Sequence, residues 1–104
     1  MVYTRGARAD FDRFASHTGD AGWSWDALFP YILKNERLVP SADGHDTSDQ
    51  VDPRFHGHGP LTVSLPNFGG VLDSHVIQTT AELDGYDFNL DMNSGNTIGV
   101  GEWD

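Results

Sequence analysis

Residues 24–37, SWDALFPYILKNER, decide how the rest of the chain is interpreted. Apolar side chains recur there at the three- and four-residue spacing of an amphipathic helix. The expected buried stripe comprises Trp25, Leu28, Phe29, Ile32 and Leu33. Ser24 or Asp26 can cap the first turn, and Pro30 is close enough to the start to be accommodated with a kink. We therefore predict a helix over residues 24–37, with its aromatic side chains in the core.

A preceding helix is predicted over residues 7–18. Phe11 and Phe14 share one face with small side chains, whereas Arg8 and Asp12 lie on the opposite, solvent-facing side. Gly19 follows the last periodic position, where a glycine commonly ends a helix. The first quarter of the chain is therefore expected to be helical.

The chain beyond the second helix reads as loop with short elements. Residues 40–54 lack periodicity and indicate an irregular surface connection. Apolar and polar side chains alternate over residues 61–65, which predicts a short strand, and helical spacing returns over residues 71–84. A further strand is possible at residues 97–103. Two or three short strands cannot form a sheet with covered edges. We therefore expect these strands to pair with segments outside this chain.

The composition excludes several classes of partner. The formal charge is −10, with 16 carboxylates against 6 Lys and Arg, so a phosphate backbone or an anionic membrane would repel the chain. No apolar run approaches the roughly 20 residues of a membrane-spanning helix. With no cysteine and a hydrophobic fraction of 38%, no disulfide compensates for a small core. We expect neither a nucleic-acid nor a membrane partner.

Six short motifs follow one another along the chain. They are MVYTRG at residues 1–6, DFD at 10–12, TGDAGWSW at 18–25, PY at 30–31, KNE at 34–36 and HGHGPL at 56–61. In this order and spacing they resemble one continuous stretch of the glucose-methanol-choline (GMC) oxidoreductase family. Residues 88–95, FNLDMNSG, resemble its fungal aryl-alcohol oxidase and pyranose dehydrogenase branch. The resemblance covers nearly the whole chain and implies an internal fragment of such an enzyme.

The resemblance implies a fold and an activity for the parent enzyme. The fold class is α+β, with residues 1–55 belonging to a Rossmann-like FAD-binding domain and residues 56–104 to the start of a substrate domain built on an antiparallel sheet. The cofactor would be FAD, and the reaction hydride transfer from the CH–OH group of an aromatic alcohol or sugar to the flavin. The expected partners are the remainder of the parent polypeptide and the small alcohol substrate, and the expected location is extracellular.

The resemblance also implies which residues approach the flavin and the substrate. The backbone of Met1 and Val2 is expected to contact the flavin, and Phe68 to lie on a flexible loop near the substrate access path. Arg5 is expected to form ion pairs with acidic neighbours. The dinucleotide fingerprint G-x-G-x-x-G is missing from the sequence, and the family's catalytic histidines map to no position here. We therefore predict no catalytic residue and no activity for the 104 residues alone.

Two metal-site hypotheses arise from the residues themselves. His56 and His58 would share one face of a strand, but the glycines beside them indicate a turn and no third ligand is evident. Residues 87–93 place oxygen ligands at alternate positions, as a calcium loop does, but Met92 and Ile98 occupy its glycine and glutamate positions. A solvated acidic loop is therefore expected, and no metal ligand is predicted. The alternative function is a small acidic calcium-binding or protein-interaction module, which calcium would stabilise against heat.

Overall fold

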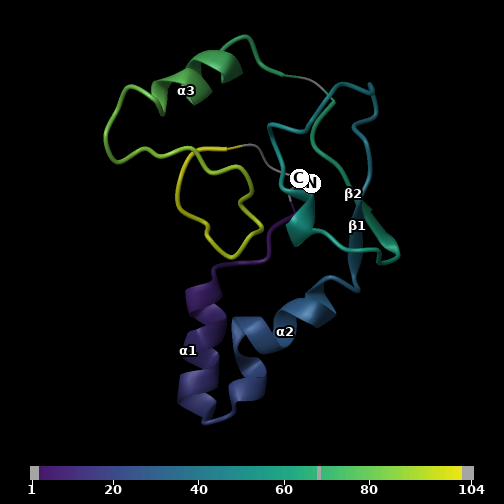
Figure 1. Cartoon of the computed structure of the whole chain (residues 1–104), viewed down its shortest axis with the longest axis vertical. Helices are drawn as coiled ribbons and strands as arrows, with labels where there is room; N and C mark the ends of the chain where they lie inside the picture. Colours follow the sequence, from purple (N-terminus) through teal and green to yellow (C-terminus); the bar gives the residue numbers. More distant parts are fainter. Residues whose placement is uncertain (1–2, 68, 102–104) are drawn as a thin grey trace.

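The computed structural model describes residues 3–67 and 69–101, and its principal extents are 47 × 36 × 21 Å. In chain order the elements are helix α1 (Arg8–Thr18), the 3-10 helix η1 (Ala21–Trp23), helix α2 (Trp25–Ile32), strand β1 (Glu36–Leu38), the 3-10 helix η2 (Pro53–Phe55), strand β2 (Leu61–Val63) and helix α3 (Asp73–Thr79). Helices α1 and α2 lie at one end of the molecule and α3 at the other, with the sheet and the long loops between them (Figure 1). Within the described ranges no helix is long and apolar enough to cross a membrane.

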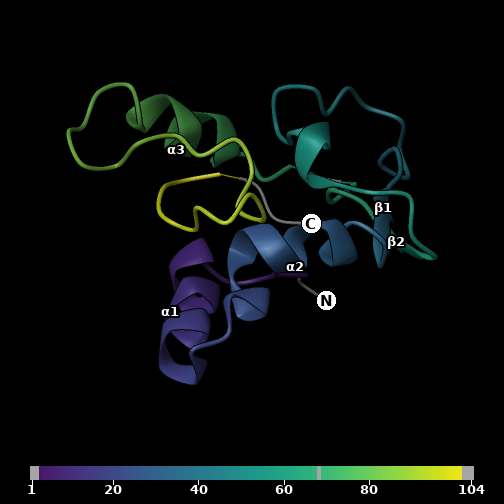
Figure 2. The same ribbon diagram turned by 60° about the horizontal axis from the view of Figure 1, so that its bottom comes forward.

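Helices α1 and α2 form where local signals predicted helices. Gly19 follows α1 with φ of 68°, a left-handed conformation that glycine adopts without steric cost. Ser24 caps α2, because its hydroxyl accepts from the Ala27 amide at 3.4 Å. The two helices are then tied together by the Asp12 carboxylate, which accepts from the Trp25 amide at 3.1 Å. Figure 2 shows the resulting α-hairpin from a second direction.

An aromatic row forms the core at this end of the molecule. Trp25 is 1% exposed and stacks on Phe29 with ring centroids 5.4 Å apart, while Phe11 of α1 meets its edge at the same distance. Phe29 in turn packs edge-on against Phe55 of η2 at 6.0 Å. Full burial of a ring such as that of Trp25 contributes on the order of 3 kcal/mol to folding. The prediction that Trp25 belongs to the core is confirmed, whereas Phe29 packs against it and is only half-buried.

Helix α2 ends at Ile32, so the predicted boundary at residue 37 is wrong. The amides of Lys34 and Asn35 make tight i→i+3 bonds to the carbonyls of Tyr31 and Ile32, which closes the helix. The carbonyls of Leu33 and Asn35 then accept from the amides of His58 at 3.3 Å and Leu61 at 3.0 Å. Pairing with a distant segment therefore takes the backbone groups that a longer helix would have used.

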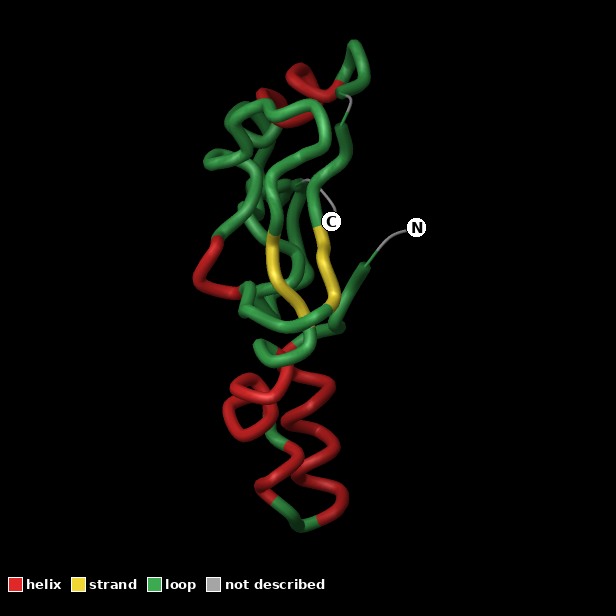
Figure 3. The backbone as a smooth tube through the Cα atoms, turned by 90° about the vertical axis from the view of Figure 1, so that its right-hand side faces the viewer, coloured by secondary structure: helices red, strands yellow, loops and turns green. Residues whose placement is uncertain are grey.

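Strands β1 and β2 form a two-stranded parallel sheet. Glu36 pairs with Leu61 and Leu38 with Val63, and Figure 3 shows the two strands lying alongside each other. The prediction of an antiparallel sheet is therefore not supported, and the expectation that the strand partner lies outside the chain is wrong for β2. The long connection at residues 39–60 is what permits a parallel pairing. Strand β2 is also shorter than the predicted 61–65.

The last third of the described chain is mostly loop. Helix α3 spans Asp73–Thr79, less than the predicted 71–84, because the turns after it are closed by i→i+3 bonds such as that from the Ala81 amide to Gln78 at 3.0 Å. In place of the possible strand at residues 97–103, Val100 makes one β-bridge with Phe88, and residues 102–104 lie outside the described ranges. The α+β class holds at the level of three helices and one small sheet.

Candidate functional site

The residues predicted to approach flavin and substrate lie outside the described ranges. These are Met1 and Val2 at the start and Phe68 in the loop after β2. Their roles stay predictions. The first described residue after Met1 and Val2 is Tyr3, which is half-buried.

Arg5 connects segments that are far apart in the sequence. Its Nη2 atom forms an ion pair with Glu36 Oε1, and its Nη1 atom donates to the carbonyl oxygens of Phe55 at 2.6 Å and Asn93 at 3.0 Å. The side chains of Arg5 and Glu36 are 3% and 0% exposed. The prediction that Arg5 forms ion pairs with acidic neighbours is confirmed, and this ion pair is fully removed from solvent.

His56 extends this ion pair into what we call the buried ionic cluster: Arg5, Glu36, His56 and Asp91. The His56 Nδ1 atom lies 2.8 Å from Glu36 Oε1, and its Nε2 atom lies 3.0 Å from Asp91 Oδ2. The His56 side chain is 1% exposed and that of Asp91 3%. His58, in contrast, is exposed, so the two histidines do not face one space as a chelating pair would.

Asn93 joins the cluster to the N-terminal backbone. Its Oδ1 atom accepts from the Arg5 amide at 3.0 Å, and its Nδ2 atom donates to the Tyr3 carbonyl at 3.2 Å. Burial, and then a hydrogen bond with Glu36, raise the pKa of the Tyr3 phenol above its usual value. The backbone from Tyr3 to Arg5 is therefore held at both residues by the buried Asn93 side chain.

The prediction of a solvated acidic loop at residues 87–93 is wrong from residue 89 onward, whereas Asp87 and Phe88 are exposed. Asn89, Asp91 and Asn93 are 8%, 5% and 2% exposed. Asn89 Oδ1 accepts from the Asp91 amide at 3.1 Å, and Asp91 Oδ1 accepts from the Asn93 amide at 2.8 Å, which are consecutive Asx turns. The alternate spacing serves hydrogen bonds within the chain, because the side-chain oxygens of Asn89, Asp91 and Asn93 already accept N–H groups. Over residues 3–67 and 69–101 no group of three or more His, Cys, Asp or Glu could hold a metal ion.

Gly57 allows His56 to reach the cluster. A Cβ atom at this position would lie 1.7 Å from the Leu33 carbonyl oxygen, well inside any real contact. The backbone after His56 is thus pressed against the turn that follows α2, where the His58 amide donates to the same Leu33 oxygen at 3.3 Å. The glycine in the HGHGPL motif has a steric role that places the histidine.

A separate surface pocket of about 620 Å³ lies between the 43–50 loop and α3. Its lining includes Asp43, His45, Asp73, Ile77 and Phe88. His45 Nδ1 lies 2.6 Å from Asp43 Oδ1, and this contact lowers the pKa of Asp43 to about 2 and raises that of His45. The lining thus combines acidic side chains, Asp43 and Asp73, with the apolar side chains of Ile77 and Phe88. Gly69 and Gly70 also line the pocket, and they follow Phe68, which was predicted to lie near the substrate access path.

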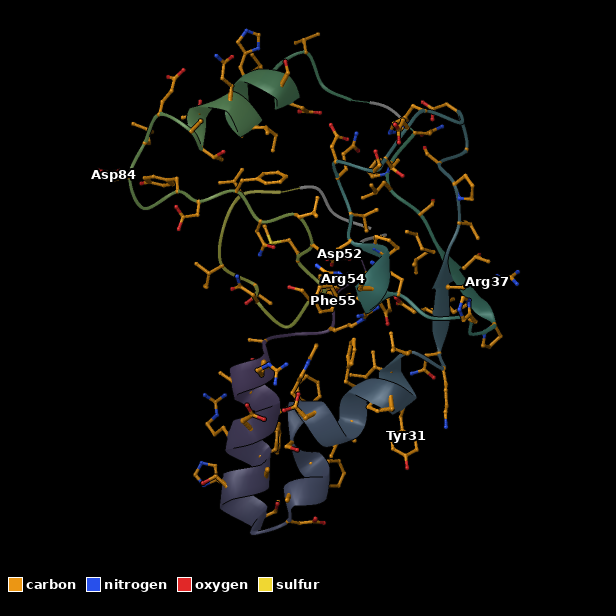
Figure 4. All side chains as sticks on the ribbon, in the orientation of Figure 1. Tyr31, Arg37, Asp52, Arg54, Phe55 and Asp84 are labelled. Carbon is orange, nitrogen blue, oxygen red and sulfur yellow. The ribbon has the colours of Figure 1, made fainter. Side chains whose placement is uncertain are left out.

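The two regions differ in chemical capacity. The buried ionic cluster is closed to solvent, so it suits positioning of the backbone rather than contact with a substrate. Asp52, Arg54 and Phe55 lie together beside the cluster in the middle of the molecule, and Tyr31 points away into solvent (Figure 4).

The sequence analysis missed two members of the cluster. Glu36 was missed because it was predicted to lie at the end of a helix, and His56 was not identified as an ion-pair partner.

Comparison with solved structures defines the class of protein. The chain superimposes on an FAD-dependent oxidoreductase from Chaetomium thermophilum with a TM-score of 0.76 and 28% identity, covering 95% of this chain and 17% of that one. It superimposes on pyridoxine 4-oxidase from Mesorbium loti with a TM-score of 0.72 and 32% identity, covering 99% and 19%. The fold is therefore that of one segment of FAD-dependent oxidoreductases.

Sequence relatives narrow this class. The chain is 44% identical over 102 residues to dehydrogenase eriK of Hericium erinaceus and 36% identical to pyranose dehydrogenase 3 of Leucoagaricus meleagris, covering 96% of this chain in each case. No protein-family model matches the chain. The chain is a homologue of one segment of fungal dehydrogenases of the GMC oxidoreductase family, and it spans 17% of the length of these relatives.

Proposed function

We propose that the chain is a segment of an FAD-dependent oxidoreductase that oxidises the CH–OH group of an alcohol, either an aromatic alcohol or a sugar. The observation that supports this is the superposition of 95% of the chain on an FAD-dependent oxidoreductase at a TM-score of 0.76. The name pyranose dehydrogenase, carried by several relatives, favours a sugar. Because the chain matches only 17% of these relatives, we propose that the remaining polypeptide completes the active site.

The helix N-termini of the described chain offer few amides for the pyrophosphate of FAD. At α1 the Arg8 amide already donates to the Gly95 carbonyl at 2.8 Å, and at α2 the Ala27 amide donates to Ser24 Oγ. These engaged amides are not open to an anion. When bound, FAD supplies the acceptor for the hydride. The contribution proposed for this chain is the backbone at Met1 and Val2, next to the segment that Asn93 holds.

Two finer parts of the proposal concern organisation and location. We propose that residues 1–55 belong to the FAD-binding domain and that residues 56–104 begin the substrate domain. His56 would then stand at the junction, in contact with Glu36 from the first part and Asp91 from the second. An extracellular location of the parent enzyme is proposed on the family resemblance alone.

A segment exchange tests the proposal directly. The residues of the Hericium erinaceus dehydrogenase that align with this chain are replaced by the present sequence, and the purified chimera is examined for flavin absorbance and substrate-dependent bleaching. We expect a yellow chimera whose flavin is reduced by the substrate of that dehydrogenase. The control is the same chimera carrying Gly57→Ala, which should lose flavin because the segment no longer packs.

The isolated chain supplies the complementary measurement. Purified and mixed with FAD, the 104 residues should remain colourless after gel filtration and should not turn over alcohols. A folded chimera that binds no flavin, or an isolated chain that retains bound flavin on its own, would contradict the proposal. A calcium-dependent rise in the melting temperature of the isolated chain would instead favour a calcium-binding module.

A further inference from the structure

The contacts of His56 restrict its protonation state. Its Nδ1 and Nε2 atoms each lie within hydrogen-bond distance of a carboxylate oxygen, of Glu36 at 2.8 Å and of Asp91 at 3.0 Å. An ionised carboxylate can only accept, and a neutral imidazole carries one N–H, so a neutral ring satisfies one of these contacts and not both. We propose that His56 is an imidazolium, and that it acts as a positioning residue that holds Glu36 and Asp91, and through them the backbone at Tyr3–Arg5, in place.

The charge balance of the buried ionic cluster supports the imidazolium. With His56 neutral, the two carboxylates of Glu36 and Asp91 would face the single guanidinium of Arg5, all with side chains at most 3% exposed. An uncompensated buried anion costs several kcal/mol. With His56 protonated, two cations face two anions and the cluster is neutral.

The other charged groups near His56 do not replace this compensation. Asp52, which precedes η2, adds a further carboxylate, and this carboxylate is already paired with Arg54 at 2.5 Å. Any effect of its negative charge on His56 favours the protonated imidazole. The Asp52 amide donates to Asp91 Oδ2 at 3.2 Å, which leaves that oxygen shared between an amide and the imidazole. Among the described Lys and Arg side chains, Arg5 is the one that pairs with a carboxylate of the cluster, that of Glu36.

The cluster acts on the N-terminal backbone through short, buried connections. Arg5 is anchored by Glu36, and its amide is bonded to Asn93 two positions after Asp91. Asn93 also donates to the Tyr3 carbonyl, and its own amide donates to Asp91 Oδ1 at 2.8 Å. Movement of Asp91 is therefore expected to move the two bonds through which the Asn93 side chain holds Tyr3 and Arg5. That this backbone continues to flavin-contacting residues rests on the proposed function, whereas the imidazolium does not.

Nitrogen NMR of the full chain, labelled at histidine, tests the protonation state without any flavin. At about pH 8, above the ordinary histidine pKa of about 6.5, we expect both His56 ring nitrogens to be protonated. A His56 ring with one unprotonated nitrogen overturns the proposal. A chain with no cooperative unfolding at any pH overturns it too, because the cluster would then fix nothing.

A charge-compensation cycle distinguishes positioning through charge from simple packing. His56→Gln should lower the folded-to-unfolded ratio at least about a hundredfold, whereas His58→Gln, the matched change at an exposed position, should leave it within about twofold. Adding Asp91→Asn to His56→Gln removes the surplus anion and should recover about tenfold of the loss. A double variant no more stable than His56→Gln overturns the proposal, and if His56→Gln proves unfolded, the nitrogen spectrum of the unsubstituted chain decides.

Discussion

The buried ionic cluster and helix α3 distribute polar and apolar side chains in opposite ways. The cluster places four charged side chains, none more than 3% exposed, inside the molecule. Around α3, large apolar side chains face outward, with Val71 90%, Leu72 66% and Val76 50% exposed. Buried charges persist only when they are paired, and large apolar patches usually mark a contact surface. The charged groups of the cluster are therefore paired within this chain, although the buried Arg5 Nε and Glu36 Oε2 atoms make no hydrogen bond among the described residues. The exposed apolar side chains around α3, in contrast, have no cover among the described residues.

The largest expected effect comes from neutralising the centre of the cluster. Glu36→Gln preserves the shape of the side chain but leaves Arg5 and His56 without the carboxylate that both contact. We expect a loss of about 3–5 kcal/mol in the free energy of unfolding, measured by urea denaturation. The same substitution at exposed Glu82 should change it by less than about 0.5 kcal/mol. Equal effects at the two positions would mean that the cluster is not held as described.

A second, smaller effect should follow from closing the space beside His56. Gly57→Ala introduces a Cβ atom into the Leu33 carbonyl, so the 56–59 backbone must shift. We expect a loss of about 1–3 kcal/mol, and a weakened His56 contact to Glu36 that is visible in the histidine ring resonances. Gly69→Ala is the control, because its Cβ would meet only Asp73 Oδ2 at an ordinary 3.6 Å. A Gly57→Ala chain as stable as Gly69→Ala would refute the steric account.

The helices and strands differ in how far the sequence could predict them. Helix α1 ends at Gly19 and helix α2 begins at Ser24, which are local signals, so the presence of both helices was predictable. Strand β1 was missed because it pairs with residues 61–63 and its Glu36 carbonyl accepts from the Gly59 amide, across a long connection that no local pattern encodes. The length of α3 was overestimated because the helical periodicity continues over turns that i→i+3 bonds close.

The cluster was only half predictable for the same reason. Arg5 was expected to meet an acidic partner from the family resemblance, and a strongly acidic chain offers many candidates. The choice of partner was not predictable: His56 lies 20 positions from Glu36 and 35 from Asp91, and only the folded chain brings them together. The loop containing Asp91 was expected in solvent because its composition is polar, although its Asx spacing could have indicated internal bonds.

A paired substitution sharpens the contrast at the apolar face. Val76→Ser on α3 alters a side chain that is 50% exposed, and should change the free energy of unfolding by less than about 0.5 kcal/mol. Val63→Ser on β2 alters one that is 8% exposed, and should cost about 1–3 kcal/mol. Val76→Ser should also reduce binding of a hydrophobic dye to the isolated chain. A large stability loss at Val76 would show that this face is covered within the chain.

The smallest expected effect concerns the exposed pair at the pocket rim. The pKa of Asp43, depressed to about 2 by its bonds with His45, means that its contribution to stability is present above the ordinary value of 3.8 and is lost as pH falls toward 2. The pKa of His45 is raised by Asp43, so its contribution is complete below 6.5 and is lost as pH rises through the folded value. The pair therefore stabilises the folded chain mainly between about pH 3.8 and the folded pKa of His45. Asp43→Asn should return the pKa of His45 toward 6.5 in an NMR titration. Because both groups face solvent, added salt should weaken the shift, and a His45 titration that is the same with and without Asp43→Asn would show that the two side chains are not paired in solution.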